Sequence, residues 1–290
     1  MARRNTMMVY SHDDPEAKPF LEKIPRYAQQ AQTLNIPYWI FVQGSNPIGI
    51  VGVGQEPIQL IATPGTTVAI IQPIDTKQPR ETIEEFASKA LEIAAQRNVE
   101  YASVLFPFEE VQAIEIFREK GFKDFDDCYR MVCQLDRDFK PSDALQFKQI
   151  QREEMRQFIS IAKKFLQGSP DITLTKALQF FFDLPEEFLN FYYTQEEFFF
   201  ALRDQKKVGV LDINTNRGLI SNVAVDSRER GKGYGRQIML FGLEQLKKSN
   251  CKQAYLRVHV ENKPAINLYE SLGFLKTDRY KTLIWKRQKD

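Results

Sequence analysis

A glycine-rich stretch at 228–236 has the residue types and spacing to bind an anion. Its glycines alternate with basic or aromatic residues at Gly231, Gly233 and Gly235. Glycine lets the backbone approach a ligand closely, so that several N–H groups can point at it. The stretch lies between the apolar run 218–225 and the amphipathic run 237–248, which predicts a strand, a tight turn and a helix. The positive end of the helix dipole would then face the turn.

Basic side chains surround the predicted turn at Arg228, Arg230, Lys232 and Arg236. Together with the backbone N–H groups, they predict a site for a di- or triphosphate-like anion. The whole chain has 40 basic and 38 acidic residues and a formal charge of +2. A protein dedicated to nucleic acid or to a membrane surface needs a large basic excess. We therefore expect a small anionic ligand, with neither nucleic acid nor membrane as a partner.

The remaining composition narrows the class of protein. The chain has 290 residues, two histidines and three cysteines, and none of these has metal-ligand spacing. We therefore expect no metal site. The first twenty residues lack the apolar segment of a signal peptide, and no apolar run reaches the roughly 18 residues that cross a membrane. We expect a soluble, cytoplasmic protein with two domains of about 130–150 residues.

The elements that position the glycine turn follow from the pattern of apolar residues. Alternation and helical periodicity predict the same order in each half: hairpin, strand, helix, strand, helix, strand. The predicted ranges are 38–54, 67–71, 82–97, 101–106, 111–120 and 129–135, then 197–214, 218–225, 237–248, 253–260, 263–272, with closing strands at 274–277 and 280–286. The fold class is therefore α/β, with a mixed, mostly antiparallel sheet flanked by helices in each half. The polar segment 136–145 contains a proline and indicates domains at 1–138 and 139–290.

The two halves repeat at a fixed offset. When residue n is placed against residue n + 152, Ala113-Ile114 meets Ala265-Ile266 and Gly121-Phe122 meets Gly273-Phe274. A gapless match with the same order of elements predicts duplication of one unit.

The halves differ at the residues that could do chemistry. Gly233 falls opposite Glu81 and Gly235 opposite Ile83. A carboxylate would repel phosphate, and a branched side chain would block close approach of the backbone. Tyr269 falls opposite Phe117, which has no hydroxyl. We therefore expect the first domain to be a degenerate, structural copy, although neutral surface differences would look the same.

Two motifs in the second half carry a resemblance to a known family. The six residues Arg230 to Gly235 match the Arg/Gln-x-x-Gly-x-Gly/Ala signature of the GCN5-related N-acetyltransferase (GNAT) family. The later Asn-x-x-Ala-x-x-Leu-Tyr and Gly-Phe motif is matched at Asn262, Ala265, Leu268, Tyr269, Gly273 and Phe274. The resemblance covers 145–290 closely and 35–137 in element order alone. The whole chain therefore resembles a tandem acyl-CoA N-acyltransferase fold.

The resemblance implies acetyl-CoA as the donor and an N-acetyltransferase activity on a primary amine. It implies that the glycine turn binds the pyrophosphate, that the strand before it pairs with the pantetheine arm, and that this strand parts from the next one to admit the thioester. The residues implied in cofactor binding are Val223, Val225, Arg230, Gly231, Lys232, Gly233, Tyr234, Gly235, Arg236 and Asn262. Asn262 would also cap its helix. Tyr269 occupies the position of the general acid that protonates the leaving thiolate.

Other functions stay open at this point. A catalytically silent module that senses acyl-CoA has the same cofactor motifs. Tandem transferases that take aminoacyl groups from tRNA would need an extended basic surface, which the balanced charge does not support. The acceptor could be a small molecule or an amine of a peptide or protein.

The residues that would receive the acceptor are also open. Asp212 and Glu261 are the acids nearest the predicted strand 218–225, and we expect both to face solvent. Four acidic residues could attract a cationic amine or form a solvated face: Glu186, Glu187, Glu196 and Glu197. The aromatic residues between 180 and 200 could line an acceptor pocket, but we expect them to fill the interface between the halves.

Overall fold

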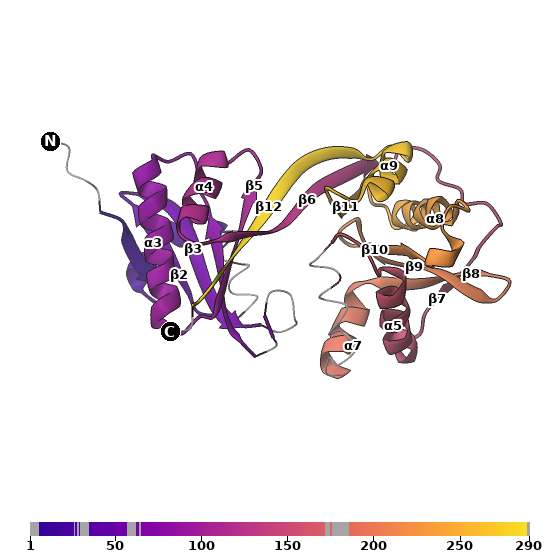
Figure 1. Ribbon diagram of the computed structural model, residues 1–290, viewed down its shortest axis with the longest axis horizontal. Coiled ribbons are helices and arrows are strands. Elements are labelled where there is room, and N and C mark those ends of the chain that lie inside the picture. Colours follow the sequence, from indigo (N-terminus) through magenta and orange to yellow (C-terminus); the bar gives the residue numbers. More distant parts are fainter. Residues whose placement is uncertain are drawn as a thin grey trace. The chain divides into compact units, whose positions relative to one another are not determined.

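The computed structural model describes residues 6–288, apart from 26, 28, 30–34, 57–61, 64, 172–174 and 176–185. The chain divides into two compact units (Figure 1): unit 1 comprises Met1–Asp127 and Tyr280–Asp290, and unit 2 comprises Cys128–Arg279. This division differs from the boundary between 138 and 139 that the sequence indicates, because two long strands each belong to both units. In the described part of the chain, every helix is too short or too polar to cross a membrane.

Unit 1 is a six-stranded sheet with the order β1-β2-β3-β4-β5-β12. Its elements are β1 (Met8–Ser11), η1 (Pro15–Ala17), α1 (Lys18–Leu21), β2 (Tyr38–Gln43), β3 (Asn46–Gln55), β4 (Thr67–Pro73), α3 (Arg80–Gln96), β5 (Tyr101–Pro107), α4 (Val111–Glu119) and the end of β12 (Leu275–Lys286). β4 and β5 are parallel, and the other neighbours in this unit are antiparallel.

The core of unit 1 lies mainly between the sheet and the helices α3 and α4. Phe86 of α3 meets Phe41 of β2 edge to face, with ring centroids 5.0 Å apart. A Cβ atom at Gly49 of β3 would lie 2.2 Å from the Phe86 ring, so the ring fits there because that position is glycine. On the opposite face of the sheet, Ile40 packs in a smaller cluster with Phe20 of α1.

Unit 2 repeats this plan with the strand order β6-β11-β10-β9-β8-β7. Its elements are β6 (Lys123–Gln134), β7 (Gln146–Gln149), η2 (Arg152–Glu154), α5 (Met155–Phe165), α7 (Glu186–Gln195), β8 (Glu197–Arg203), β9 (Lys206–Asn214), β10 (Leu219–Val225), η4 (Ser227–Glu229), α8 (Tyr234–Lys248), β11 (Gln253–His259) and α9 (Lys263–Ser271). β10 and β11 are parallel, and the other neighbours in this unit are antiparallel.

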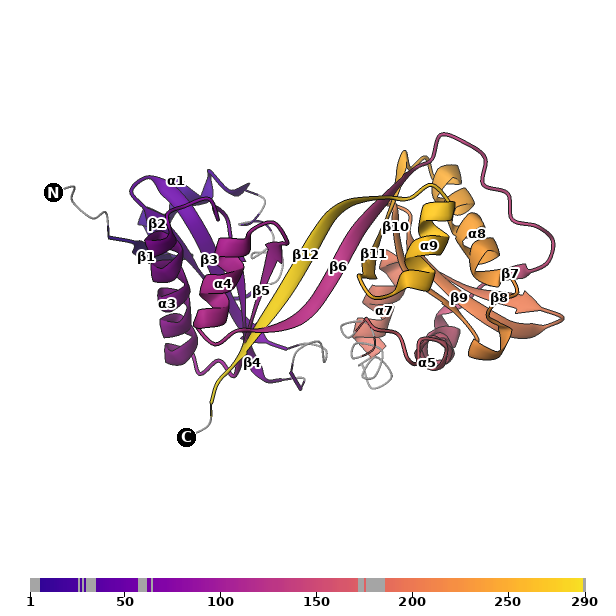
Figure 2. The same cartoon turned by 45° about the horizontal axis from the view of Figure 1, so that its top comes forward.

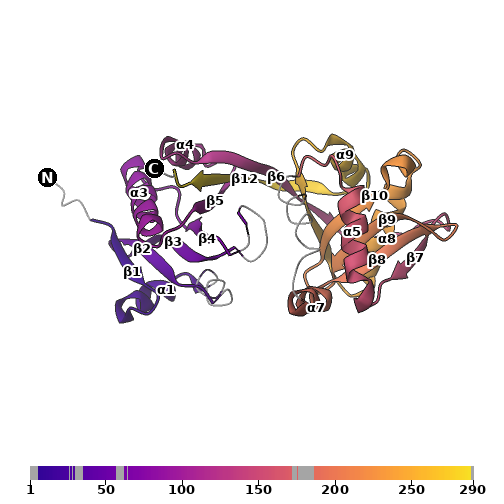
Figure 3. The ribbon, with the colours of Figure 1, turned by 60° about the horizontal axis from the view of Figure 1, so that its bottom comes forward.

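Helices cover both faces of the unit 2 sheet (Figure 3). Leu243 of α8 and Ile266 of α9 share one buried cluster with Leu211 of β9. On the other face, Phe158 of α5 lies 5.1 Å from Phe198 of β8, centroid to centroid, and Tyr192 of α7 lies 5.7 Å from the same ring. The side chains of β9 therefore alternate between an α8 face and an α5 and α7 face.

The offset found in the sequence recurs in the element bounds. Thr67–Pro73 of β4 and Leu219–Val225 of β10 differ by 152 residues (219 − 67), and so do the bounds of β5 and β11, α4 and α9, and β6 and β12. The later elements of the repeat, from β4 in the first half and from β10 in the second, therefore have the same lengths and spacing.

The two long strands are exchanged between the units (Figure 2). Residues Cys128–Gln134 of β6 pair with β11 in unit 2. Residues Tyr280–Lys286 of β12 pair with β5 in unit 1. The two closing strands expected from the sequence are therefore one strand, and the C-terminal residues complete the sheet of unit 1.

This exchange predicts that unit 1 depends on a residue close to the C-terminus. Leu283 is fully buried in the core of unit 1. Leu283→Ala should lower the free energy of unfolding of unit 1 by about 2–5 kcal/mol, because it leaves a cavity in that core. Both tryptophans of the chain, Trp39 and Trp285, belong to or pack on that core, so their fluorescence during urea unfolding reports on unit 1.

Leu275→Ala is the matched control for this prediction. Leu275 starts the same strand but is 71% exposed, so its removal should change stability by less than about 0.5 kcal/mol. An unchanged tryptophan transition in Leu283→Ala would contradict the strand exchange.

Candidate active site

The site begins where β10 and β11 part. Within the described residues the two strands pair at one position, Leu219 with Tyr255, and the Tyr255 N–H donates to the Gly218 carbonyl over 2.7 Å. Gly218 has φ +65°, and a Cβ atom there would lie 2.4 Å from the carbonyl oxygen of Gln253. Beyond this point the register of β10 with β9 shifts at Ser221. The bulge and the parting together open the sheet.

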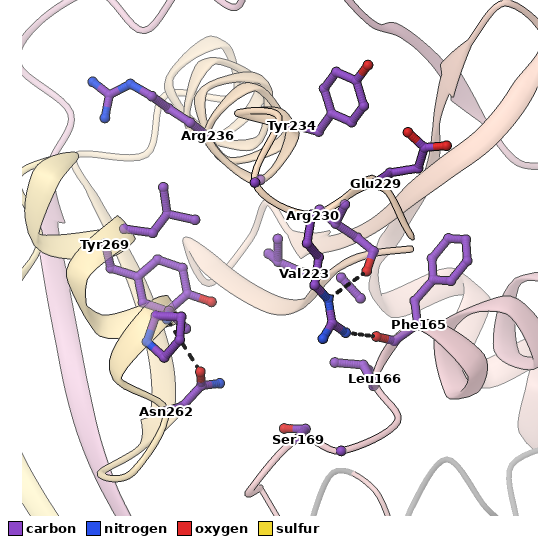
Figure 4. A pocket seen from close by; sticks show the side chains of 18 of the residues that line it. Phe165, Leu166, Ser169, Val223, Glu229, Arg230, Tyr234, Arg236, Asn262 and Tyr269 are labelled. Atoms are coloured by element: carbon purple, nitrogen blue, oxygen red, sulfur yellow. Dashed lines mark hydrogen bonds between the residues drawn. The ribbon is translucent and has the colours of Figure 1, made fainter. Parts of the chain in front are cut away.

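A cavity of about 550 Å³ lies at the opened end of the sheet. It is lined by the end of β10, the glycine turn, the start of α8, the start and middle of α9, and the loop that follows α5. Figure 4 shows Tyr269, Asn262, Val223 and Arg230 around this cavity. The predicted cofactor-binding residues line it, with the exception of Lys232.

The three glycines of the turn have two different roles. Gly231 and Gly233 have φ +79° and +80°, and a Cβ atom at either would meet nothing within 4 Å. Glycine is needed at these two positions because the backbone is left-handed there. A larger side chain would have room, since no neighbouring atom crowds it. Gly233 is the N-cap of α8. Gly235 allows close packing instead, since a Cβ atom there would lie 3.3 Å from Leu268 of α9.

Two of the four basic side chains near the turn are already paired with acids. Arg228 donates to the buried Asp226 over 2.8 Å and lowers the pKa of Asp226 to about 2. The Lys232 ammonium lies 2.7 Å from Glu229 and is not among the residues that line the cavity. Lys206 binds the same carboxylate, and the two lysines lower the pKa of Glu229 to about 2. Glu229 itself lines the cavity.

The other two basic side chains hold the cavity walls together. The Arg230 guanidinium donates to the backbone carbonyls of Val225 and Phe165 (Figure 4), over 3.3 and 2.7 Å, and so ties the end of β10 to the end of α5. Arg236 donates to Ser271 Oγ over 2.9 Å and links α8 to α9. Both arginines line the cavity.

Tyr269 and Asn262 lie at opposite ends of one face of α9. Tyr269 is half-buried, and its hydroxyl points into the cavity (Figure 4). Burial, together with the carboxylate of Asp171, raises the pKa of Tyr269 to about 12. Asp171 in turn accepts two hydrogen bonds from Arg257 of β11, at 3.1 and 3.2 Å. Asn262 caps α9 by accepting from the Ala265 N–H, as expected from the sequence.

The two acids expected to face solvent, Glu261 and Asp212, differ in how far they are buried. Glu261 is exposed at the rim of the cavity, as expected. Asp212 is completely buried, so the expectation for it was wrong. Asp212 lies on the α5 and α7 face of β9, where Asn222 of β10 donates its amide to it over 2.6 Å. Burial and the nearby carboxylate of Glu196 raise the pKa of Asp212 well above its ordinary value.

The aromatic residues at 198–200 belong to the core of unit 2. Phe198 and Phe200 both contact Phe158 of α5, and Phe199 lies in the cluster on the α8 face. The expectation that they fill an interface between the halves was therefore wrong for these three residues. Residues 180–182 and 184 lie outside the described part of the chain.

Sequence reasoning missed one wall of the cavity. Residues 165–170 contribute Phe165, Leu166, Ser169 and Pro170, and nothing in that short polar segment signals a ligand. A signal for the buried Asp212 did exist, since an acid interrupts the apolar run 208–213. Among the described residues, no three His, Cys, Asp or Glu side chains are grouped so that they could hold a metal ion.

Residues 155–274 match the model of the acetyltransferase (GNAT) family. Over 63 residues the chain is 35% identical to N-alpha-acetyltransferase 30 of Saccharomyces cerevisiae, which is 22% of this chain and 36% of that protein. The chain spans 36% of the length of that protein, and 23% and 17% of the length of N-alpha-acetyltransferase 30 of Xenopus laevis and of Homo sapiens.

Similarity of structure extends over the whole chain. A GCN5-related N-acetyltransferase from Sphaerobacter thermophilus matches with a TM-score of 0.67 and 13% identity, over 97% of this chain and 95% of that one. A tandem GNAT protein from the clavulanic acid biosynthesis pathway matches with a TM-score of 0.62 and 13% identity, over 98% and 100%. At this identity the likeness concerns the fold alone, and it confirms the fold class expected from the sequence.

The raised pKa of Asp212 predicts how stability depends on pH. An ordinary aspartate ionises near pH 4 in the unfolded chain, whereas folded Asp212 keeps its proton to higher pH. Stability should therefore fall as pH rises above about 4, by up to about 1.4 kcal/mol per pH unit, until the raised pKa is reached. Asp212→Asn has no carboxyl group to ionise, so this fall in stability is absent. The free energy of unfolding of the variant should exceed that of the wild type at pH 7, and the difference should be smaller at pH 4.

Scanning calorimetry between pH 4 and 8 measures this difference. Asp204→Asn is the control, because the Asp204 side chain is 91% exposed and should have no effect. A melting temperature of Asp212→Asn below that of the wild type at pH 7 would contradict the raised pKa of Asp212.

Proposed function

We propose that the protein belongs to the acetyltransferase (GNAT) family, whose model matches residues 155–274, and that it transfers an acetyl group from acetyl-CoA to a primary amine. One observation carries the proposal: a single cavity joins the glycine turn to the hydroxyl of Tyr269. An anion site at one end and a proton donor at the other suit a long thioester whose reactive group lies far from its phosphates.

The residues present fit the coenzyme. Backbone N–H groups of residues 231–235, at the start of α8, would hold the pyrophosphate, supported by the helix dipole. Val223 and Val225 lie on β10 past the position where it leaves β11, so their backbone groups can pair with the pantetheine arm. Arg230, Tyr234, Arg236 and Asn262 would complete the walls. Lys232, turned toward Glu229, would act through its charge alone.

Tyr269 would act as the general acid. The neutral amine nitrogen forms a bond to the thioester carbonyl carbon, the carbon–sulfur bond breaks, and the sulfur takes the phenolic proton. The proton that the nitrogen loses returns to the phenolate. With a pKa of about 12, Tyr269 stays protonated near neutral pH and can donate in each turnover. The products are an acetylated amine and the free thiol of coenzyme A.

We further propose that unit 1 is a structural copy without this activity. In unit 1 the strands that correspond to β10 and β11 are β4 and β5, and they pair at four positions. Phe117, the counterpart of Tyr269, is fully buried and packs on Phe106 and Phe122. Arg80, beside the counterpart of the glycine turn, pairs with Glu84 and Glu119. These features support a closed sheet that leaves no room for a thioester.

Tyr269→Phe tests the general acid. The variant keeps the ring and loses the proton donor, so thiol release from acetyl-CoA in the presence of an accepted amine should fall by about 10²-fold or more. Affinity for coenzyme A, measured by calorimetry, should change little. Tyr101→Phe in unit 1 is the control and should retain wild-type turnover.

Equal turnover in Tyr269→Phe and wild type would remove Tyr269 from the mechanism. A wild-type protein that binds acetyl-CoA but releases no thiol with any amine would instead favour the sensor of acyl-CoA.

Gly233→Glu tests the anion site. It introduces the residue of the first half at a position with φ +80°, and it should abolish measurable binding of coenzyme A through backbone strain and repulsion of phosphate. Gly65→Glu is a matched control, because Gly65 has φ +84° and open space around it but lies in unit 1. Unchanged affinity in Gly233→Glu would exclude the turn as the phosphate site.

A further inference from the structure

The loop that follows α5 forms one wall of the cavity. Gly168 has φ +77°, and the Ser169 N–H donates to the Leu166 carbonyl over 3.0 Å, so the chain turns sharply where the helix ends. Asp171 comes directly after this turn and is 8% exposed. The residues of the loop that line the cavity are Phe165, Leu166, Gly168, Ser169 and Pro170.

The backbone of Asp171 is held on both sides of the residue. Its N–H donates to Ser169 Oγ over 3.3 Å. Its carbonyl accepts from the N–H and from the hydroxyl of Thr175, over 3.0 and 2.9 Å. Local hydrogen bonds therefore constrain the direction in which the Asp171 side chain leaves the loop.

Two arginines, one from each side of the opened sheet, hold the two ends of this loop. Arg230 comes from the glycine turn after β10 and donates to the Phe165 carbonyl over 2.7 Å (Figure 4). Arg257 lies on β11, and one of its nitrogens donates to both carboxylate oxygens of Asp171 over 3.1 and 3.2 Å. Within the described residues β10 and β11 pair with each other at one position. The loop therefore joins the two strands through side chains where their backbones have parted.

The carboxylate of Asp171 also acts on Tyr269. Burial and this negative charge raise the pKa of Tyr269 to about 12. A negative charge close to a phenol disfavours the phenolate, so the hydroxyl keeps its proton. The other charged side chains that line the cavity or lie on α9 are exposed or bonded to other groups: Glu229, Arg230, Arg236, Glu261, Lys263 and Glu270.

We propose that Asp171 is a positioning residue of the transfer reaction: with Arg257 it fastens the cavity wall to β11, and it holds a negative charge beside the hydroxyl of Tyr269. The proposal rests on the function proposed above and deepens it. Neither Asp171 nor Arg257 is among the residues that line the cavity, so both act through the loop and through Tyr269.

The charge of Asp171 has its effect after the sulfur has taken the phenolic proton. Tyr269 is then a phenolate, and the nitrogen that has bonded to the carbonyl carbon gives up a proton to it. A nearby carboxylate makes the phenolate a stronger base, so this return of the proton is more favourable. The guanidinium of Arg257 compensates the buried charge of Asp171, which would otherwise be costly.

Asp171→Asn tests the proposal because it keeps the size of the side chain and removes its charge. The phenol of Tyr269 should then ionise about one pH unit lower than in the wild type. At pH 11, about a tenth of Tyr269 should be ionised in the wild type and about half in the variant. The measurement is the NMR chemical shift of the tyrosine Cζ carbon in labelled protein, with the Tyr269 signal assigned from its absence in Tyr269→Phe.

Activity is measured with a tetrapeptide that has a free N-terminus and with spermidine. For each of these that the wild type acetylates, kcat of Asp171→Asn should fall by about tenfold or more, because the wall and the proton donor are no longer held in place. Asp171→Glu keeps the charge and should recover most of the lost kcat and the high ionisation pH of Tyr269.

Arg257→Gln separates positioning from a merely structural role. It releases the same end of the loop but leaves the charge of Asp171, so kcat should fall while Tyr269 ionises at the wild-type pH or higher. If the pair only stabilised the loop, Arg257→Gln and Asp171→Asn would shift the ionisation of Tyr269 in the same direction. Should Asp171→Asn fail to fold, a lower ionisation pH of Tyr269 in Arg257→Gln would overturn the proposal.

Glu270→Gln is the matched control. Glu270 is the neighbour of Tyr269 on α9, but it is exposed and pairs with Lys276 over 2.7 Å. Its removal should leave kcat and the ionisation of Tyr269 as in the wild type. Wild-type kcat in Asp171→Asn, or an unchanged ionisation of Tyr269 there, would overturn the positioning role. A wild type that releases no thiol, with the NMR shift as expected, would overturn the transfer and keep the placement of the charge.

Discussion

The parting of β10 from β11 is the constraint on which the rest of unit 2 depends. Backbone N–H and C=O groups need partners, and a parallel neighbour normally provides them. After Leu219 and Tyr255 that neighbour is gone, so the edge of β10 near Val223 and Val225 is left for an extended ligand. Arg230 takes one of these groups, the carbonyl of Val225, and thereby fixes the loop after α5 as a cavity wall.

In the sheet of unit 1, the strands that correspond to β10 and β11 do not part. β4 and β5 remain paired along Val68 to Ile71, and Phe117 fills the place where a hydroxyl would be. The two sheets nevertheless depend on each other's strands. β6 pairs with β11 in the sheet of unit 2, and β12 pairs with β5 in the sheet of unit 1. Each sheet is therefore incomplete without a strand encoded in the other half of the repeat.

The sequence predicted the features that leave a local mark. Gly231 and Gly233 need a left-handed backbone, and the 152-residue offset preserves the order of elements, so the turn and both sheets were found. It failed where tertiary context decides. The polar residues Asp278 and Arg279 looked like a break, but β12 runs through them because it passes there from one unit to the other. The link that the Arg230 guanidinium makes between the carbonyls of Val225 and Phe165 also left no mark in the sequence.

The apolar run around Asp212 hinted at its burial, but alternation along β9 gives two faces and does not say which helices cover each. Its energetics nevertheless indicate a role. Replacing a buried ionisable pair by apolar residues of similar volume often stabilises a protein, so such a pair is weak evidence for a structural purpose. Groups with strongly shifted pKa values are concentrated at sites of chemistry. Asp212 of β9 accepts from Asn222 beside the bulge that opens the sheet, and its carboxyl group shares a hydrogen bond with Glu196.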